Sequence, residues 1–212
     1  MPRYIPLMID AEGKNVLVIG GGHIAYRKSK LFLENGARVI VIAKEFYKGF
    51  RNIPAKLIQN DVRDVDNIES LISNSLIVIA ATENRETNDY VEKLCNIAGK
   101  LCNIVDKQST YVMFPAFFKK RDIIVSVSTS GNVPYFSAFL RDVVKNELLL
   151  YLKGYTVLKR LRKKLMKVEP KVRKSVLKEV VHDSKFWESV QANDKKSADK
   201  IINEITKKWV DV

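Results

Sequence analysis

The sequence predicts an α/β fold: a parallel sheet with crossover helices, followed by a small α+β region and a helical C-terminal region. Two observations support this prediction. Up to about residue 112, short apolar segments alternate with helix-like segments, which is typical of parallel strands joined by helices on both faces of a sheet. From about residue 145 onwards, apolar residues are interleaved with basic ones in the pattern of amphipathic helices.

The first region, residues 1–112, supplies the elements of the predicted sheet. We expect strands at 15–20, 38–43, 56–59, 76–81 and 101–105, and helices at 23–35, 65–73 and 87–98. Gly36 is a natural C-cap between the first of these helices and the second strand. Ligands of such a sheet bind outside the carboxyl ends of its strands, where the strand order reverses.

A glycine turn follows the first strand. Residues 15–25 read NVLVIGGGHIA, the order of strand, glycine turn and helix start in a Rossmann-type dinucleotide-binding unit. Gly20 permits the tight turn, Gly22 lets the backbone approach a pyrophosphate, and the small Ala25 lets the helix pack closely on the strand. The helix N-terminus offers unpaired N–H groups and the positive end of its dipole to the phosphates. A structural turn that binds no ligand is the alternative interpretation.

Polar residues gather at the predicted carboxyl ends of the later strands. Thr82 and Asn84 follow SLIVIAAT, while Asn103 and Asp106 lie in LCNIVDK. An Asx-turn is the alternative role for Asp106, and an ordinary turn position is the alternative for His23. The expected dinucleotide-binding residues are Gly20, Gly22, His23, Ile24, Ala25, Ala43, Lys44, Thr82, Asn84 and Asn103.

The second region, residues 113–144, begins with the apolar run MFPAFF. It continues through the strand IIVSVS and the turn TSGNVP into a helix from Tyr135. Ser128, Thr129, Ser130 and Gly131 form a hydroxyl-rich turn that we expect at the same crevice as the glycine turn. Hydrogen bonding of these hydroxyls to their own backbone is the alternative. The third region, residues 145–212, is expected to be helical with breaks at Gly154 and Pro170.

The charge of the chain is unevenly placed. The net charge is +13, and residues 145–212 carry 18 Lys and Arg against 9 Asp and Glu. A basic helical tail invites a nucleic-acid interpretation, but we find no recognition-helix, zinc-finger or RNP-type pattern. A polyanionic small molecule explains the charge equally well, so no nucleic-acid partner is predicted.

Several classes of protein are disfavoured by what the sequence lacks. No apolar run reaches the roughly 20 residues that span a bilayer, and the first residues do not resemble a signal peptide. Cys95 and Cys102 have no CxxC spacing and no histidine nearby, so we expect reduced packing residues and no metal site. The expectation is a cytoplasmic protein without a membrane partner.

The motifs together resemble one family. GGGHIAYRK, AATENRETN, CNIVDK, MFPAFF, VSTSGNVP and Arg141 occur in the order seen in the siroheme synthase N-terminal family, and SKFWESV resembles a segment near the end of that module. These proteins are precorrin-2 dehydrogenases, some of which are also sirohydrochlorin ferrochelatases. The resemblance covers nearly the whole chain.

This resemblance implies a function and a site. It implies NAD-dependent oxidation of precorrin-2, a tetrapyrrole with eight carboxylates, to sirohydrochlorin, and it leaves open whether iron insertion accompanies the oxidation. Asp106 matches the family's important aspartate and becomes the candidate general base. Thr129 falls where the family carries a hydroxyl residue, so that Ser128, Thr129, Ser130 and Gly131 become candidate substrate-binding residues. The family architecture implies a homodimer in which residues 113–144 form the dimer contact, and residues 1–112 bind NAD.

The sequence also departs from the family pattern. Ser130 replaces the first of two glycines and Val133 replaces a serine, which puts the shape of that loop in doubt. The second strand ends in Lys44 rather than in the acidic residue that binds the ribose of NAD, and Glu45 comes one step later. The resemblance favours NAD, whereas Lys44 leaves NADP open.

Two other functions remain as alternatives. A regulatory module that senses NAD(H) without catalysis explains the glycine turn but gives Asp106 no role. A nucleic-acid-binding protein explains the basic tail and requires binding that weakens steeply with salt.

Overall fold

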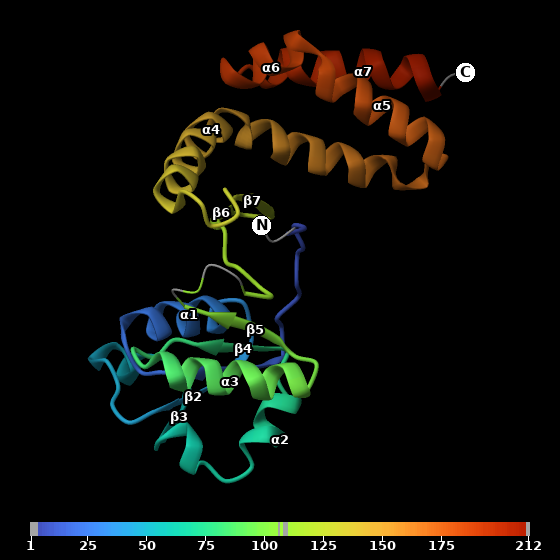
Figure 1. Ribbon diagram of the computed structural model, residues 1–212. Coiled ribbons are helices and arrows are strands. Elements are labelled where there is room, and N and C mark those ends of the chain that lie inside the picture. Colours follow the sequence, from blue (N-terminus) through green and yellow to red (C-terminus); the bar gives the residue numbers. More distant parts are fainter. Residues whose placement is uncertain (1–3, 106, 108–109, 211–212) are drawn as a thin grey trace. The chain divides into compact units, whose positions relative to one another are not determined.

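The computed structural model, which describes residues 4–105, 107 and 110–210, contains the five-stranded parallel sheet that the sequence predicts (Figure 1). Its strands are β1 (Asn15–Ile19), β2 (Arg38–Ala43), β3 (Lys56–Gln59), β4 (Ile77–Ala80) and β5 (Leu101–Ile104). The order is β3-β2-β1-β4-β5, so it reverses between β1 and β4. Because Ile19 lies opposite both Ile42 and Ala80, the carboxyl ends of β2, β1 and β4 meet at one edge.

Helices cover both faces of this sheet (Figure 1). They are α1 (His23–Leu33), α2 (Ile68–Ser73) and α3 (Arg85–Ile97), with short 3-10 helices η1 (Lys48–Asn52) and η2 (Val62–Asp64). Alternate residues of β1 face opposite sides, as the period of a strand requires. Val16 and Val18 pack in the core beneath α1, whereas Leu17 and Ile19 pack in the core with α2 and α3. The predicted α/β fold is confirmed.

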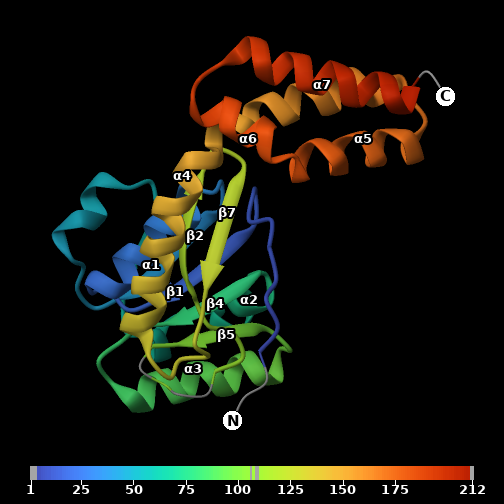
Figure 2. The same ribbon diagram turned by 90° about the horizontal axis from the view of Figure 1, so that it is seen from above.

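The chain divides into two compact units. The first contains the sheet and consists of Met1–Phe114 with Ser130–Asn132; the second consists of Pro115–Thr129 and Val133–Val212. The second unit begins with an antiparallel hairpin and continues as helices that pack together in both ribbon views (Figures 1 and 2). Its elements are β6 (Ala116–Lys120), β7 (Ile123–Val127), α4 (Pro134–Lys164), η3 (Leu165–Lys167), α5 (Pro170–His182), α6 (Ser184–Gln191) and α7 (Lys195–Val210).

One expected helix break is absent and the other is present. Gly154 lies inside the continuous helix α4, so the predicted break there is wrong. The glycine instead allows close packing, because a Cβ at this position would lie 2.3 Å from Cζ3 of the Trp187 ring. Pro170 does stand at a break, as the first residue of α5, where a proline needs no N–H partner.

Within the described part of the chain, none of the helices combines the length and the apolar character that crossing a bilayer requires.

Candidate functional site

The glycine turn after β1 contains two glycines that the chain's own backbone requires. Gly20 has φ +115°, and a Cβ there would lie 2.3 Å from the carbonyl oxygen of Ala81. A Cβ on Gly21 would lie 1.8 Å from the carbonyl oxygen of Glu45. The Gly20 N–H also donates to Ile42 O at 2.8 Å, and Tyr47 N–H donates to Gly21 O at 2.7 Å. These two positions are therefore glycine because the turn packs against the strands on either side of β1.

Gly22 is different, because among the described residues, its two chain neighbours aside, no atom lies within 4 Å of the position that its Cβ would occupy. Its φ of −76° and ψ of −175° are open to any residue, so neither packing nor backbone conformation demands a glycine. Gly22 is the N-cap of α1 and provides no side-chain cap. The first turn of α1, which includes His23, Ile24 and Ala25, contains no acidic residue. This geometry leaves backbone N–H groups accessible to an anion such as a pyrophosphate.

The predicted residue Ala43 ends β2, and Lys44, which follows it, contacts a carboxylate that was not predicted from the sequence. Lys44 Nζ lies 2.8 Å from Asp61 Oδ2, and Asp61 follows β3 rather than β2. The hydrogen bond with Asp61 raises the pKa of Lys44, and the same bond lowers the pKa of Asp61. An acidic side chain that follows the neighbouring strand β3 thus lies next to Lys44.

An aromatic cluster lies beside the glycine turn. The ring centroids of His23 and Tyr47 are 5.2 Å apart in an edge-on arrangement, and Tyr26 lies 5.3 Å from Tyr47. His23 is therefore an exposed member of an aromatic group. Tyr47 was not predicted as a site residue, although its position shortly after β2 was the available signal.

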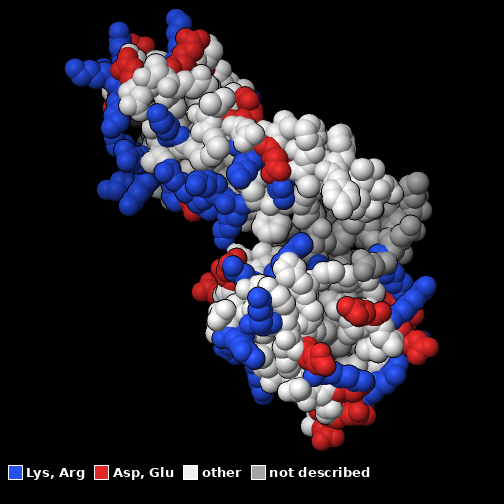
Figure 3. All heavy atoms as spheres, turned by 90° about the vertical axis from the view of Figure 1, so that its left-hand side faces the viewer, with Lys and Arg blue, Asp and Glu red and all other residues white. Residues whose placement is uncertain are grey.

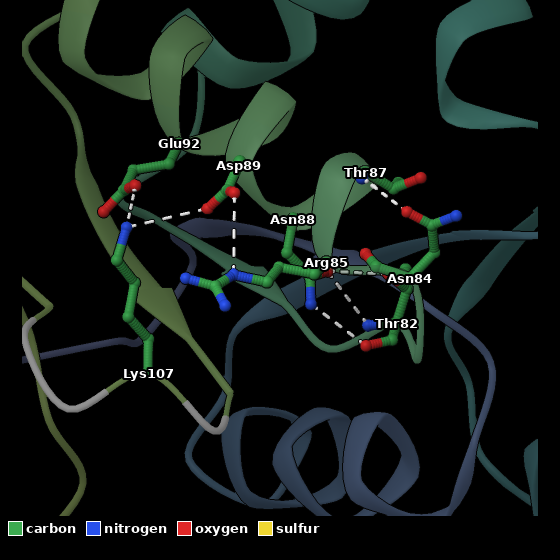
Figure 4. Close-up of polar contacts among 8 residues, drawn as sticks. All are labelled: Thr82, Asn84, Arg85, Thr87, Asn88, Asp89, Glu92 and Lys107. Atoms are coloured by element: carbon green, nitrogen blue, oxygen red, sulfur yellow. Dashed lines mark hydrogen bonds and ion pairs between the residues drawn. The ribbon is translucent and has the colours of Figure 1, made fainter.

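The loop after β4 is held by a buried amide (Figure 4). Asn88, which is 6% exposed, accepts from Thr82 N–H at 3.2 Å and donates through Nδ2 to Thr82 O at 3.0 Å. Thr82 Oγ1 lies 2.7 Å from Asn88 Oδ1, and Asn84 Oδ1 caps α3 by accepting from Thr87 N–H at 2.9 Å. Thr82 and Asn84 thus shape the loop at the sheet edge, and Asn88 is the residue that fixes it.

Asn103 in β5 carries a buried acceptor. Its Nδ2 donates to Val112 O at 2.7 Å, and only 6% of the residue is exposed. Among the residues that the structure describes, none forms a hydrogen bond with Asn103 Oδ1. Because buried polar atoms are nearly always paired, this oxygen offers a place for a donor from a ligand, such as an amide N–H. Together with the open space at Gly22, this orphaned oxygen fits a bound dinucleotide.

The candidate base Asp106 lies outside the described residues, whereas the chain on either side of it is described. Val105 N–H donates to Ala80 O at 2.9 Å, next to the end of β4. Lys107 forms an ion pair with Glu92 and lies 3.7 Å from Asp89 Oδ1 (Figure 4), and the hydrogen bond with Glu92 raises the pKa of Lys107. Thr110 Oγ1 donates to Cys102 O at 2.9 Å. The described residues on both sides of Asp106 are therefore anchored to the sheet or to α3.

The structure divides the hydroxyl-rich turn between the two units. Ser128 and Thr129 belong to the second unit, and Ser130 and Gly131 belong to the first. Thr129 Oγ1 accepts from Val133 N–H at 3.0 Å and lies 3.1 Å from the hydroxyl of Ser137, so this side chain stabilises its own turn. Ser130 has φ +55° and Gly131 has φ +84°. Ser130 thus keeps a left-handed conformation at a position where the family pattern has glycine.

Comparisons with known proteins agree with this geometry. Residues 7–116 match a family model described as "Putative NAD(P)-binding". A protein of Methanosarcina barkeri named precorrin-2 dehydrogenase is 28% identical over 210 residues, which cover 93% of this chain and 92% of that protein. Siroheme synthase 2 of Aeromonas salmonicida is 31% identical over 194 residues, and the match covers 90% of this chain but only 38% of that protein.

A solved structure has the same fold. The structure titled SirC, precorrin-2 dehydrogenase, superposes with a TM-score of 0.75 at 21% identity, covering 97% of this chain and all of that one. The chain thus spans the full length of one kind of relative and less than half the length of the other.

Proposed function

The chain belongs to the NAD(P)-binding family and is related to proteins named precorrin-2 dehydrogenase and siroheme synthase, and on that premise we propose that it oxidises precorrin-2 to sirohydrochlorin with NAD. The observation that carries this proposal is the match with the Methanosarcina barkeri protein, which covers more than nine-tenths of both chains. The open space at Gly22 and the orphaned oxygen of Asn103 support it, because both suit a bound dinucleotide.

In this proposal the residues at the carboxyl edge of the sheet divide into those that bind NAD and one that removes a proton from precorrin-2. NAD, when bound, supplies the acceptor for the hydride that leaves precorrin-2. Gly22 and the first turn of α1 hold the pyrophosphate through backbone N–H groups. Asn103 Oδ1 accepts from an amide of the dinucleotide, and Thr82, fixed by Asn88, keeps the loop after β4 in place. Asp106 takes the proton, so that the macrocycle loses one hydride and one proton, or two electrons in total.

We propose NAD rather than NADP as the coenzyme. A free cation at the end of β2 would favour the 2′-phosphate of NADP. Lys44 is not free, because it forms an ion pair with Asp61 at 2.8 Å. A 2′-phosphate near Lys44 would therefore also meet the carboxylate of Asp61, whereas a ribose hydroxyl can donate to it.

We propose that the hydroxyl-rich turn and the basic surface bind the substrate. Ser128, Thr129, Ser130 and Gly131 present hydroxyl and backbone groups, and the net charge of +13 attracts a polycarboxylate. Residues 1–112 then form the NAD-binding domain, 113–144 the dimerisation and active-site region, and 145–212 the helical domain.

A homodimer is part of the proposal. Tyr135, Phe139 and Val143 are spaced four residues apart on one face of α4, and they are 90%, 60% and 48% exposed. Large exposed apolar side chains in a row are typical of an interaction surface. We therefore propose that a second copy of the chain covers this face of α4.

We also propose a cytoplasmic location. Cys95 and Cys102 are both buried, free thiols, as expected of a protein that folds in a reducing compartment.

The role of Asp106 has a direct test. The variant Asp106→Asn should bind NAD as the wild type does and lose oxidation by a factor of about 100 or more, in the range of a lost general base. Binding is measured by calorimetry and turnover by the sirohydrochlorin spectrum under anaerobic conditions. Asp66→Asn is the matched control and should keep full turnover. Normal turnover in Asp106→Asn would remove this residue from the mechanism and would favour a protein that only senses NAD(H).

A further inference from the structure

A cavity of about 740 Å³ lies within the second unit, and no step of the proposed reaction uses it. Its walls come from α4, the start of η3, α6, the α6–α7 connection and α7, and Arg121 comes from the turn between β6 and β7. All of these residues belong to the same compact unit. The volume is within the usual range of small-molecule sites.

The rim of this cavity is positively charged. The lining contains five cations, Arg121, Lys153, Arg160, Lys164 and Lys195, and two carboxylates. On the face drawn in Figure 3, Lys and Arg side chains also gather over the helical part of the molecule, at the upper left. A concave surface with an excess of one sign of charge concentrates ligands of the opposite sign.

Arg121 and Lys153 donate hydrogen bonds to Thr156 Oγ1 and Asn193 Oδ1, and the other three cations have no acidic partner among the described residues. Within the described part of the chain, no carboxylate forms an ion pair with Arg160, Lys164 or Lys195. One of the two carboxylates, Asp194, accepts from the backbone and hydroxyl of Ser197 at 3.1 and 2.6 Å. These hydrogen bonds lower the pKa of Asp194 and direct its carboxylate to the start of α7. The rim therefore retains a positive balance.

The floor of the cavity is apolar. It is formed by Leu161, Leu165, Val190, Ala198 and Ile202, which belong to the core of the helical unit. None of the described lining residues is aromatic. Single-stranded nucleic acid binds on aromatic side chains that stack on its bases, so this cavity lacks the feature that such a ligand needs. An apolar floor below a ring of cations suits a flat hydrophobic ring with several acidic groups at its edge.

We propose that this cavity is a second binding site for an amphipathic polycarboxylate, of the class of the tetrapyrrole that the enzyme processes. The ring contacts the apolar floor, and the carboxylates contact Arg160, Lys164 and Lys195. The choice of a tetrapyrrole rests on the proposed function, whereas the cavity and its charge do not. Such a site holds the labile macrocycle on the helical unit, whereas the dinucleotide is proposed to bind at the sheet edge of the first unit.

The test uses uroporphyrin I, a stable tetrapyrrole octacarboxylate, as the probe. Both tryptophans of the chain, Trp187 and Trp209, lie in the helical unit, so their emission reports a porphyrin bound there by energy transfer. The test variant is R160A/K164A. The matched control is R162A/K163A, which removes the same charge from the same helix at exposed positions outside the cavity lining. Alanine favours the helix at all four positions, so both variants should fold, as circular dichroism will show.

We expect saturable quenching in the wild type, at least a tenfold weaker affinity in R160A/K164A, and a change below twofold in R162A/K163A. Equal weakening in both variants would show nonspecific attraction to the basic helix and would overturn the proposal, as would the absence of quenching. Precorrin-2 oxidation by the same proteins separates the two proposals. If the protein oxidises precorrin-2 but R160A/K164A binds the porphyrin no more weakly than R162A/K163A, only the second site is disproved. If R160A/K164A alone binds the porphyrin weakly but the protein does not oxidise precorrin-2, only the dehydrogenase activity is disproved.

Discussion

At the scale of single residues, Gly20 and Gly22 differ in what their missing side chains leave room for. Gly20 makes room for the protein itself, because its φ is +115° and Ala81 O occupies the space of a Cβ. Gly22 leaves space that no described protein atom fills. Gly20 is therefore required by the fold, whereas Gly22 leaves room for the proposed ligand.

This difference predicts opposite phenotypes for two alanine variants. Gly20→Ala should lower the free energy of unfolding by about 2 kcal/mol or more, because it combines a strained φ with a backbone overlap. Gly22→Ala should change stability by less than about 0.5 kcal/mol and weaken NAD binding at least tenfold. Urea unfolding and calorimetric titration measure the two effects. Tight NAD binding by a stable Gly22→Ala protein would contradict the assignment of the phosphate site.

Lys28 is a half-buried cation on α1, and its partial burial makes the charged form less stable in the folded protein. Its Nζ lies 3.8 Å from the centroid of the Phe114 ring. Burial, with a smaller contribution from Arg27, lowers the pKa of Lys28 from 10.5 to about 8. Because the unfolded chain holds this proton up to pH 10.5 and the folded chain only up to about pH 8, stability should rise with pH between these values.

The corresponding prediction concerns Lys28→Met, which keeps the packing of the side chain and removes its charge. At pH 7 this variant should be about 1–2 kcal/mol more stable than the wild type, since the desolvation cost exceeds the cation–π attraction. The difference between the two proteins should shrink as the pH rises from 8 to 10.5. Urea unfolding of both proteins across this range is the measurement. A difference that is independent of pH would show that Lys28 titrates normally.

At the scale of elements, the sheet follows from local patterns and α4 does not. The five expected strands are all present, and four of them are short apolar runs bounded by turn residues, whereas β3 (KLIQ) is a largely exposed strand at the edge of the sheet. A glycine normally weakens a helix, so Gly154 looked like a break. The reason for this glycine is Trp187, which lies on α6 and is distant in the sequence. Local reasoning cannot identify such a partner.

In the candidate site, too, local sequence patterns identified the turn but not the contacts between residues that are distant in the sequence. The glycine turn was visible in the sequence because its three glycines are adjacent. The pairing of Lys44 with Asp61 was not, since it joins residues from the ends of two different strands. Asn88 was visible only as a residue at the start of a helix, although it clamps Thr82 through its buried amide.

The packing of α4 on α6 gives a prediction of its own. Gly154→Ala should destabilise the protein by about 1–3 kcal/mol, because the overlap with the Trp187 ring outweighs the roughly 1 kcal/mol gain in helix propensity. In a Trp187→Leu background the same substitution should instead stabilise by about 1 kcal/mol. Thermal and urea unfolding of the wild type, the two single variants and the double variant complete this double-mutant cycle. A stabilising Gly154→Ala in the wild-type background would disprove the close contact.

At the scale of the whole molecule, the exposed face of α4 predicts association. Phe139→Glu places a charge in the centre of the row formed by Tyr135, Phe139 and Val143, so it should convert a dimer into a monomer. Val144→Glu is the control, because Val144 is 38% exposed and lies on another face of the helix. Light scattering over a range of concentrations gives the mass of each protein. A wild-type protein that is monomeric at all concentrations would contradict the proposed dimer.

The central claim is that this chain transfers a hydride from precorrin-2 to NAD. The most direct measurement is an anaerobic reaction with enzymatically generated precorrin-2, in which NADH and sirohydrochlorin are followed together, with NADP in a parallel reaction. We predict equal amounts of the two products, formation that depends on the protein, and a much slower reaction with NADP. A folded protein that binds NAD but produces no sirohydrochlorin would contradict the claim.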